Sequence, residues 1–583
     1  MPGLVFDLLA VPVSLSLRRP RSSLRSFHFA YSSSIATPTR WPPRRSFSVV
    51  THCRNDLFNY TSGRWIINDA LRHAERRRVF NVDGLRRLAA ESVGRSPDDM
   101  VDLRKHAEGG LNRIFLITMR DGFRMVARIP YPAAILKYFT VASEVATMAL
   151  LRSSGLPIPE VYGYSPAPDN VAETEYIFME FVEGTNLGHE WFGLEEGDII
   201  SISRQLAELE SKMMSIAFPA GGSLYYTKDL EKVAGRPGVP LDDKRFCVGP
   251  DISLPLWFGR RSQLDVDRGP YENAEAALVR GAEKELAYLE RFGRPLLPFQ
   301  RTRRKGYQYQ EQLPSDHVEN LDRYLLVASS LIPRNPALSH FRIRHPDLRP
   351  QNIIVSGSPD SDLRVVGLID WQYTSILPLF LLGGIPQSLQ NLGDPISHRM
   401  ARFSLPENLD DLDDTERSQE KELYRRRLVH YHYVKNTEEH NELLYAALID
   451  PAGELRRRLF RYASDPWEGE TLALKVALIQ ATENWETLTG GGLPCPVVFD
   501  AEDVRATTKL DAKQSEADDT LEEAYENLFC FGPEGWVPTE LYEVAMARSK
   551  RMKENALAAA SPEERAQIAA HWPFDDMDEM EYD

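Results

Sequence analysis

The pattern of apolar and polar positions divides the chain into a strand-rich stretch followed by a helical one. Alternating apolar residues between glycine turns predict strands, whereas apolar residues three or four apart predict helices. The first stretch is expected to hold strands at 101–107, 112–119, 124–129 and 175–182, with one helix at 139–153. Asp121-Gly122 between two of these runs is a strong hairpin signal. This order predicts a small α+β lobe over residues 101–184.

Beyond residue 184 the apolar spacing becomes mainly helical. Strand-like runs at 352–355 and 364–369 interrupt it on either side of a turn, and the helical lobe is expected to span 185–492. The helices are expected near 194–216, 272–292, 315–332, 415–450 and 470–488. The acidic run 407–416 fits a solvated loop or a helix start better than a metal site.

The two flanking regions have weaker patterns. In the extension 48–100, Leu85, Leu88, Ala89 and Val93 recur at helical spacing and predict one helix. Residues 493–583 form a C-terminal extension with fewer apolar positions, and six of the last nine residues are acidic. We expect that acidic end to be a mobile tail, because like charges repel one another.

The composition of the first 54 residues differs from that of the rest. They contain eight arginines, no lysine, many serines and a single acid, Asp7. This composition is typical of a mitochondrial presequence, and Arg45-Ser46-Phe47-Ser48 resembles a matrix processing site, which predicts a presequence over 1–47. A disordered N-terminal tail is the alternative. The apolar stretch from Leu4 to Leu17 is too short and broken to span a membrane.

Charge and cysteine usage exclude several function classes. The formal net charge is −16, and removing seven arginines and Asp7 with residues 1–47 would bring it to −22. Such a chain offers no positive field for a nucleic-acid backbone, so nucleic acid is not expected as a partner. Its four cysteines form no C-x-x-C pair, which argues against zinc or thioredoxin chemistry and fits a reducing compartment.

The residues that point to a reaction lie between 341 and 372. The run 345–352 has the form H-x-D-L-x-x-x-N, and a second acid, Asp370, ends an apolar strand. In phosphoryl transfer, Asp347 at this spacing can accept the proton of an attacking hydroxyl, and Asn352 and Asp370 can hold Mg²⁺ on the nucleotide phosphates. Arg349 either lies near the γ-phosphate or pairs with an acid. His345 is expected to brace the loop by hydrogen bonding.

These motifs carry a family resemblance. With Ile369-Asp370-Trp371, residues 101–390 resemble the aminoglycoside phosphotransferase branch of the protein-kinase-like fold. That resemblance implies a bilobal α+β molecule that uses ATP and Mg²⁺. Four further blocks resemble the fungal family named altered inheritance of mitochondria protein 9, which implies a mitochondrial location: Phe58–Trp65, Asp267–Tyr271, Tyr424–Arg427 and Asp465–Gly469.

The resemblance also suggests nucleotide-binding positions in the small lobe. Gly109-Gly110 fits the loop over the phosphates, because glycine lets backbone N–H groups approach an anion; a plain hairpin turn is the alternative. Arg128 stands where the family has a phosphate-anchoring Lys, and Glu144 is its expected ion-pair partner. Glu180 falls where the lobes join, where backbone groups would meet the adenine edge.

The sequence thus predicts a mitochondrial phosphotransferase, expected in the matrix, that acts on a small molecule. No Ala-Pro-Glu segment follows Asp370, which argues against a protein substrate. The Arg at position 128 keeps a second class open, a pseudokinase that serves as a scaffold or nucleotide sensor. A detoxifying antibiotic kinase is a third possibility. The acceptor and the oligomeric state stay open.

Overall fold

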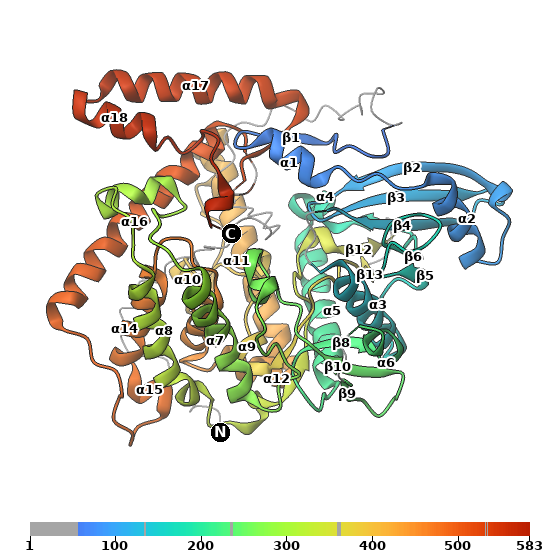
Figure 1. Cartoon of the computed structure of the whole chain (residues 1–583), viewed down its shortest axis with the longest axis horizontal. Helices are drawn as coiled ribbons and strands as arrows, with labels where there is room; N and C mark the ends of the chain where they lie inside the picture. The colour runs from blue at the N-terminus through green and yellow to red at the C-terminus, as the bar shows by residue number, and fades with distance from the viewer. Residues whose placement is uncertain are drawn as a thin grey trace.

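A computed structural model describes residues 56–132, 136–233, 237–357, 363–530, 532 and 534–582. The predicted presequence, residues 1–47, lies outside these described residues. The strand-rich lobe and the helical lobe lie side by side, and the C-terminal helices lie along one end of the molecule (Figure 1). Within the described residues no helix has the length and apolar character needed to cross a bilayer.

The small lobe contains a five-stranded antiparallel sheet in the order β2-β3-β4-β6-β5. Four of its strands, and the helix that follows the third of them, confirm the predictions from alternation and turn residues. The fifth, β5, was not expected, since its short run alternates weakly around a glycine. The elements are β2 (Met100–Glu108), β3 (Asn112–Met119), β4 (Arg124–Pro130), α3 (Lys137–Ser153), β5 (Val161–Ser165) and β6 (Tyr176–Glu180).

The two faces of this sheet are covered by different helices. On one face Phe115 and Phe178 are buried with Leu85 of α2 (Val82–Ser92), the helix expected in the extension. On the other face Ile177 and Met179 share a core with α3 and the helical lobe. Because side chains of a strand alternate between faces, every second residue of β6 points toward the space between the lobes.

The helical lobe contains the expected helices, but two of the predicted helices are each divided in two. The predicted helix 415–450 is two helices, because the side chain of Asn441 accepts a hydrogen bond from Leu444 N (3.1 Å) and begins a new one. The acidic run supplies the start of the first, where Asp413 and Glu416 form a capping box. The principal helices are α5 (Glu196–Ser215), α7 (Ala274–Phe292), α8 (Pro314–Ala328), α11 (Asp414–His440), α12 (Glu442–Leu448), α13 (Gly453–Ser464), α14 (Leu472–Glu483) and α15 (Trp485–Thr489). The predicted helix 470–488 is α14 and α15, which meet at Asn484.

The chain passes between the lobes at Gly184. A Cβ there would lie 2.5 Å from Val355 O, and the backbone φ is +152°, so only glycine fits this close approach. The chain then forms β7 (Thr185–Asn186), which joins β12 (Ile353–Ser356) and β13 (Arg364–Leu368) in one small sheet. β12 and β13 confirm the two strands expected around the catalytic run.

A second small sheet was not expected from the sequence. It contains β8 (Ser223–Tyr226), β10 (Phe246–Gly249) and β9 (Val239–Pro240), with the short helix α6 (Thr227–Glu231) after β8. Its strands of two to four residues are too short to give a clear alternation. This sheet packs on α3, where Tyr225, Leu230 and Cys247 form an apolar cluster with Ala142.

The C-terminal extension packs against residues 63–72, near the start of the described chain, so the prediction of a mobile tail is wrong. β15 (Trp536–Pro538) pairs with β1 (Gly63–Trp65). Asp576 accepts a hydrogen bond from Asn68 N (2.6 Å), Glu579 pairs with Arg72, and Tyr582 is buried. The acidic end is held in place because the buried Arg72 pairs with Glu579. The sequence pattern does not reveal such a distant partner. The helices of the extension are α16 (Ala501–Asn527), α17 (Tyr542–Ala559) and α18 (Pro562–Ala570).

Candidate active site

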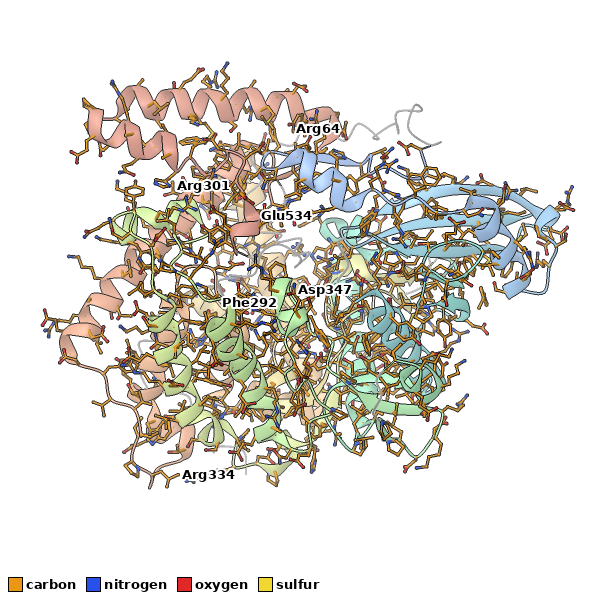
Figure 2. All side chains as sticks on the ribbon, in the orientation of Figure 1. Arg64, Phe292, Arg301, Arg334, Asp347 and Glu534 are labelled. Atoms are coloured by element: carbon orange, nitrogen blue, oxygen red, sulfur yellow. The ribbon has the colours of Figure 1, made fainter. Side chains whose placement is uncertain are left out.

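The predicted catalytic run lies between β11 (Phe341–Ile343) and β12, near the centre of the molecule (Figure 2). The imidazole of His345 braces it. Asp347 N donates to Nδ1 (3.1 Å), so the other ring nitrogen, Nε2, carries the proton and donates to Ile369 O (2.9 Å). Burial lowers the pKa of His345 to about 4, so the ring is neutral near pH 7. His345 therefore joins the catalytic run to the segment after β13 that carries Asp370.

Asp347 and its neighbours form one polar group, joined by an ion pair and by hydrogen bonds. Arg349 Nε lies 2.9 Å from Asp347 Oδ2, and Asn352 Nδ2 donates to Asp347 O (2.8 Å) and Oδ2 (3.2 Å). Burial raises the pKa of Asp347 to about 6, against the lowering effect of the Arg349 guanidinium, and nearby Asp370 adds to the rise. Two positions were expected for Arg349, near the γ-phosphate or paired with an acid. In the structure it pairs with Asp347.

Asp370 is brought beside this group by the pairing of two strands. Ile369 N donates to Asn352 O (3.0 Å), which sets the end of β13 against the end of the catalytic run. The backbone of Asp370 is left-handed, with φ of 68°, an uncommon conformation for a residue other than glycine. Its side chain remains 43% exposed, so the carboxylate is open to a ligand.

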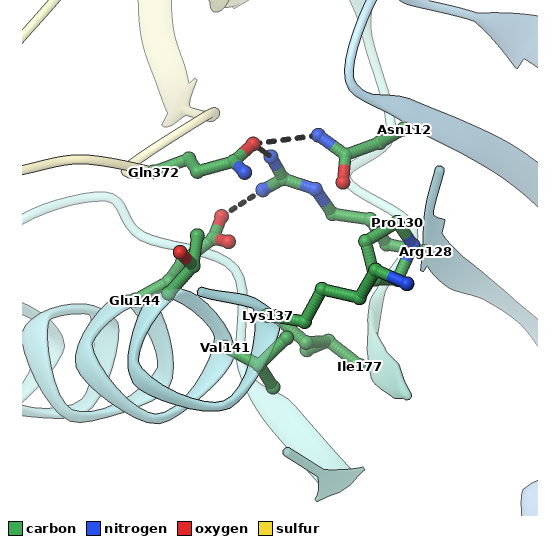
Figure 3. Close-up of a pocket in the computed structure, with 9 residues that line it drawn as sticks. Asn112, Arg128, Pro130, Lys137, Val141, Glu144, Ile177 and Gln372 are labelled. Carbon is green, nitrogen blue, oxygen red and sulfur yellow. Dashed lines mark hydrogen bonds and ion pairs between the residues drawn. The ribbon is translucent and has the colours of Figure 1, made fainter. Parts of the chain in front are cut away.

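Arg128 reaches across from the small lobe to Asp370. On one side its guanidinium pairs with Glu144 of α3, as expected. On the other, Nη2 lies 2.9 Å from Asp370 Oδ1. The same nitrogen lies 2.6 Å from Gln372 Oε1 (Figure 3). The side-chain amide of Asn112 also lies 2.7 Å from Gln372 Oε1. These five residues, from β3, β4, α3 and the segment after β13, form one polar cluster.

The remaining predicted positions lie less directly at this cluster. Gly109 and Gly110 lie in the turn from β2 to β3, with Leu111 between them and Asn112, and Gly109 N donates to Asn112 O (2.9 Å). The side chain of Glu180 accepts from Arg152 Nη1 (3.1 Å) and Glu160 N (3.0 Å). Its place in β6 is on the face opposite Ile177, so only its backbone is available between the lobes.

The sequence did not single out three residues of the site. Asn112 and Gln372 belong to the Arg128 cluster, and Lys137 lines the same pocket together with Glu144 (Figure 3). Gln372 follows Asp370 by two positions and Asn112 follows the glycine turn, which is the only sequence signal that either offers. Polar residues beside a turn are common, so that signal is weak without the fold.

The oxygen atoms of the site suit a hard divalent cation. Asn352 uses its amide nitrogen on Asp347, which directs Oδ1 away from that residue. Asp370 uses Oδ1 on Arg128, which leaves Oδ2. Carboxylate and amide oxygens of this kind are the protein ligands that Mg²⁺ takes, with phosphate oxygens and waters as the others. The residues present therefore fit the metal that the resemblance implies.

Comparison with known proteins agrees with this geometry. Residues 102–380 match the model of the family described as "Phosphotransferase enzyme family". The chain is also 30% identical over 517 residues to a subtelomeric hrmA-associated cluster protein of Aspergillus fumigatus, covering 82% of this chain and 97% of that protein. The chain belongs to the phosphotransferase enzyme family. The matched segment contains every predicted site residue, from Gly109 to Asp370.

Further relatives and solved structures have lower identity. Altered inheritance of mitochondria protein 9 of Clavispora lusitaniae, named as mitochondrial, is 24% identical and covers 89% of this chain and 92% of its own length. Among solved structures, the macrolide 2'-phosphotransferase of Brachybacterium faecium is 13% identical, with a TM-score of 0.27 over 71% of this chain and 100% of that one. The family match and the two lobes described above show that this chain has the expected bilobal, protein-kinase-like α+β fold.

Proposed function

We propose that this protein transfers the γ-phosphoryl group of ATP to a hydroxyl of a small molecule. The observation behind the proposal is the meeting of two groups that the sequence keeps far apart. Asp347, with Arg349 and Asn352, lies beside Asp370, and Asp370 contacts the Arg128–Glu144 pair of the other lobe. Base, metal-ligand oxygens and a phosphate-binding cation are the parts that phosphoryl transfer needs in one place.

Asp347 is the proposed base. The acceptor oxygen bonds to the γ-phosphorus as the bond from that phosphorus to the β–γ bridging oxygen breaks, and the acceptor proton passes to Asp347. A carboxyl whose pKa burial raises to about 6 is mostly ionised near pH 7, and it is a stronger base than an exposed aspartate. Arg349 and Asn352 orient it from two sides.

Arg128 is proposed to bind the phosphates, with Glu144 holding its guanidinium in place. Arginine offers a planar fork of donors that can bridge two phosphate oxygens. Gly109 is proposed to lie over the same phosphates. The fold itself does not need glycine there, because a Cβ would meet only Asn112 O at 3.5 Å, an ordinary contact. Close approach of a ligand would explain the residue.

Asn352 and Asp370 are the proposed Mg²⁺ ligands. When bound, the ion would supply positive charge that neutralises the phosphate oxygens. Asp370 then has two cations to satisfy, because its other oxygen already contacts Arg128. The small-molecule acceptor and the absence of nucleic acid as a partner rest on the sequence alone, as does the expectation of no stable membrane insertion.

The mitochondrial matrix is the proposed location. Residues 1–47 have the composition of a presequence, and relatives such as that of Clavispora lusitaniae are named as mitochondrial. Fractionating cells that produce the full chain with a C-terminal tag would test this. A shorter, protease-protected form in the matrix is expected, and a full-length cytosolic form would overturn the location.

The activity is tested on purified residues 48–583. Mg-ATP at 100 times its dissociation constant should stabilise the fold by about 2.7 kcal/mol. A panel of hydroxyl-bearing metabolites should then contain one that gains a phosphate. No thermal shift at millimolar ATP, with Mg²⁺ present, would count against the proposal.

A pseudokinase is the second candidate, and the contact of Arg128 with Asp370 favours it. In that function the ion pair would close the metal position, and the protein would act as a scaffold or nucleotide sensor. Asp347→Asn separates the two candidates in a strain that lacks the gene. Full restoration of growth by the variant would favour the scaffold, whereas failure at normal protein abundance would favour the enzyme.

A further inference from the structure

The small sheet β8-β10-β9 contacts both parts of the proposed site that must stay in register. One part is α3, which carries Glu144, and the other is the segment 371–376 that follows Asp370. Gly222 and Ile376 exchange two backbone hydrogen bonds (2.9 and 2.6 Å), and Ser223 Oγ donates to Thr374 O (3.0 Å). The sheet therefore lies against the turn that begins at Asp370.

Asp251, two residues after β10, contacts this turn most directly. It is 3% exposed, and its Oδ1 accepts from Ser375 Oγ (2.6 Å) and Ser253 N (2.9 Å). Its Oδ2 accepts from Tyr271 Oη (3.1 Å). Among the described residues these partners are hydroxyl and backbone N–H groups, and none of them is a cation. Burying a carboxylate without a cation is costly, so these hydrogen bonds decide whether the residue is tolerated.

The backbone of Asp251 leads to α3. Trp257 Nε1 donates to Asp251 O (2.7 Å), and the Trp257 ring stacks on Phe139 of α3 with centroids 6.2 Å apart. Phe139 lies five residues before Glu144 on the same helix. A single buried residue thus joins the turn after Asp370 to the helix that holds Arg128 through Glu144.

The turn itself needs outside support. Asp370 and Tyr373 both have left-handed backbones, with φ of 68° and 62°. For residues with a side chain this conformation carries a cost, and it persists when surrounding contacts fix it. The contacts of Ser375 and Thr374 with the small sheet lie within two residues of Tyr373.

We infer that Asp251 is a positioning residue for the phosphoryl-transfer site, holding the turn that carries Asp370 in register with α3. The inference rests on the proposed function for its catalytic meaning, but its structural content can be measured without any ligand. Asp251 touches no reacting group. It acts through Ser375 on the Asp370 turn and through Trp257 on α3.

The first test is hydrogen–deuterium exchange of the ligand-free protein. Asp251→Ala is expected to speed exchange in the 371–376 segment by about tenfold. The matched control is Asp229→Ala in α6, an equally buried acid of the same region whose side chain contacts Tyr164 and Lys232 instead of this turn. Unchanged exchange in Asp251→Ala, or an equal change in the control, would overturn the inference.

The second test measures how ATP binding depends on Mg²⁺ concentration. Asp251→Ala is expected to raise the half-saturating Mg²⁺ concentration about tenfold, because Asp370 is displaced, and Asp251→Asn is expected to restore most of it by keeping the acceptor for Ser375. Lower stability without any shift in the Mg²⁺ dependence would show a purely structural role.

Ser375→Ala removes the donor of the same hydrogen bond. It replaces Asp251→Ala in both tests if that variant does not fold. It is expected to reproduce both effects, and the double variant should be no worse than either single one. If the unmodified protein binds no Mg-ATP, the proposed function fails. The exchange measurement still decides whether Asp251 positions the turn.

Discussion

Two buried Arg–Glu pairs in different parts of the molecule show how differently one interaction can be used. Arg128 and Glu144 lie between the lobes, with side chains 6% and 3% exposed, and Arg128 also contacts the half-exposed Asp370. Arg261 and Glu285 lie inside the helical lobe, and both side chains are fully buried. The first pair has an open carboxylate beside it, whereas the second does not.

The partners of the second pair explain this difference. Glu285 also accepts hydrogen bonds from Lys284 Nζ (2.7 Å) and Trp467 N (2.6 Å). All of its partners come from the packed helices and the 465–469 block, so its charge serves to fix the arrangement of this lobe. A buried ion pair by itself therefore indicates nothing about function, and the open acid beside it is what marks a site.

The largest expected effect concerns Asp347, in the site beside the Arg128–Glu144 pair. Asp347→Asn should lower the rate of phosphoryl transfer by about 10²–10⁴-fold, because the substituted amide cannot accept the proton. Mg-ATP affinity and the unfolding midpoint should stay close to those of the unmodified protein. Single-turnover kinetics and thermal unfolding check both statements, and a rate within tenfold would remove Asp347 from the chemistry.

Breaking the fully buried Arg261–Glu285 pair should instead lower the stability of the fold. Arg261→Met leaves Glu285 without its guanidinium partner and should cost about 3–5 kcal/mol of unfolding free energy. Urea denaturation measures this. Arg245→Met is the control, since Arg245 and Asp243 form an exposed pair whose loss should change nothing measurable. Equal losses of unfolding free energy in the two variants would mean that the buried Arg261–Glu285 pair contributes no more to stability than an exposed pair.

Arg128 itself should respond in ligand binding. Arg128→Met should weaken Mg-ATP binding by about 10- to 100-fold, the loss of one or two charge-assisted hydrogen bonds. Arg128→Lys should lose less, because the family's usual lysine keeps the charge. Isothermal titration of both variants decides between the candidates. ATP affinity that rises in Arg128→Met would instead mean that Arg128 blocks the metal position.

The smallest effect is the dependence on pH. Burial raises the pKa of Asp347 to about 6, and the base must be ionised to accept a proton. The ratio kcat/KM should therefore fall as the pH drops, to about half its plateau near pH 6. Initial rates between pH 5 and 8, with saturating Mg²⁺, would show it, and a flat profile would exclude an ionising base.

The sequence by itself determined the elements and the spacing of the catalytic run. β3, β4, α3, β12 and β13 follow from local patterns, because periodicity and turn residues depend only on neighbours in the chain. The positions of Asp347, Asn352 and Asp370 were accessible for the same reason, since they lie within a short run whose spacing is itself the signal. The extra sheet and the packed C-terminus were not.

Only the tertiary structure decided which distant residues meet. Arg128 and Asp370 are 242 residues apart, and nothing in either neighbourhood shows that a guanidinium lies 2.9 Å from the carboxylate. The roles of Gln372 and Asp251 could not be predicted for the same reason, because each side chain acts through a contact with a residue of another element. The acidic composition of the C-terminus likewise predicted a mobile tail, and this was wrong because Glu579 pairs with Arg72. Local pattern fixes what each segment becomes, whereas contact between segments fixes what its side chains do.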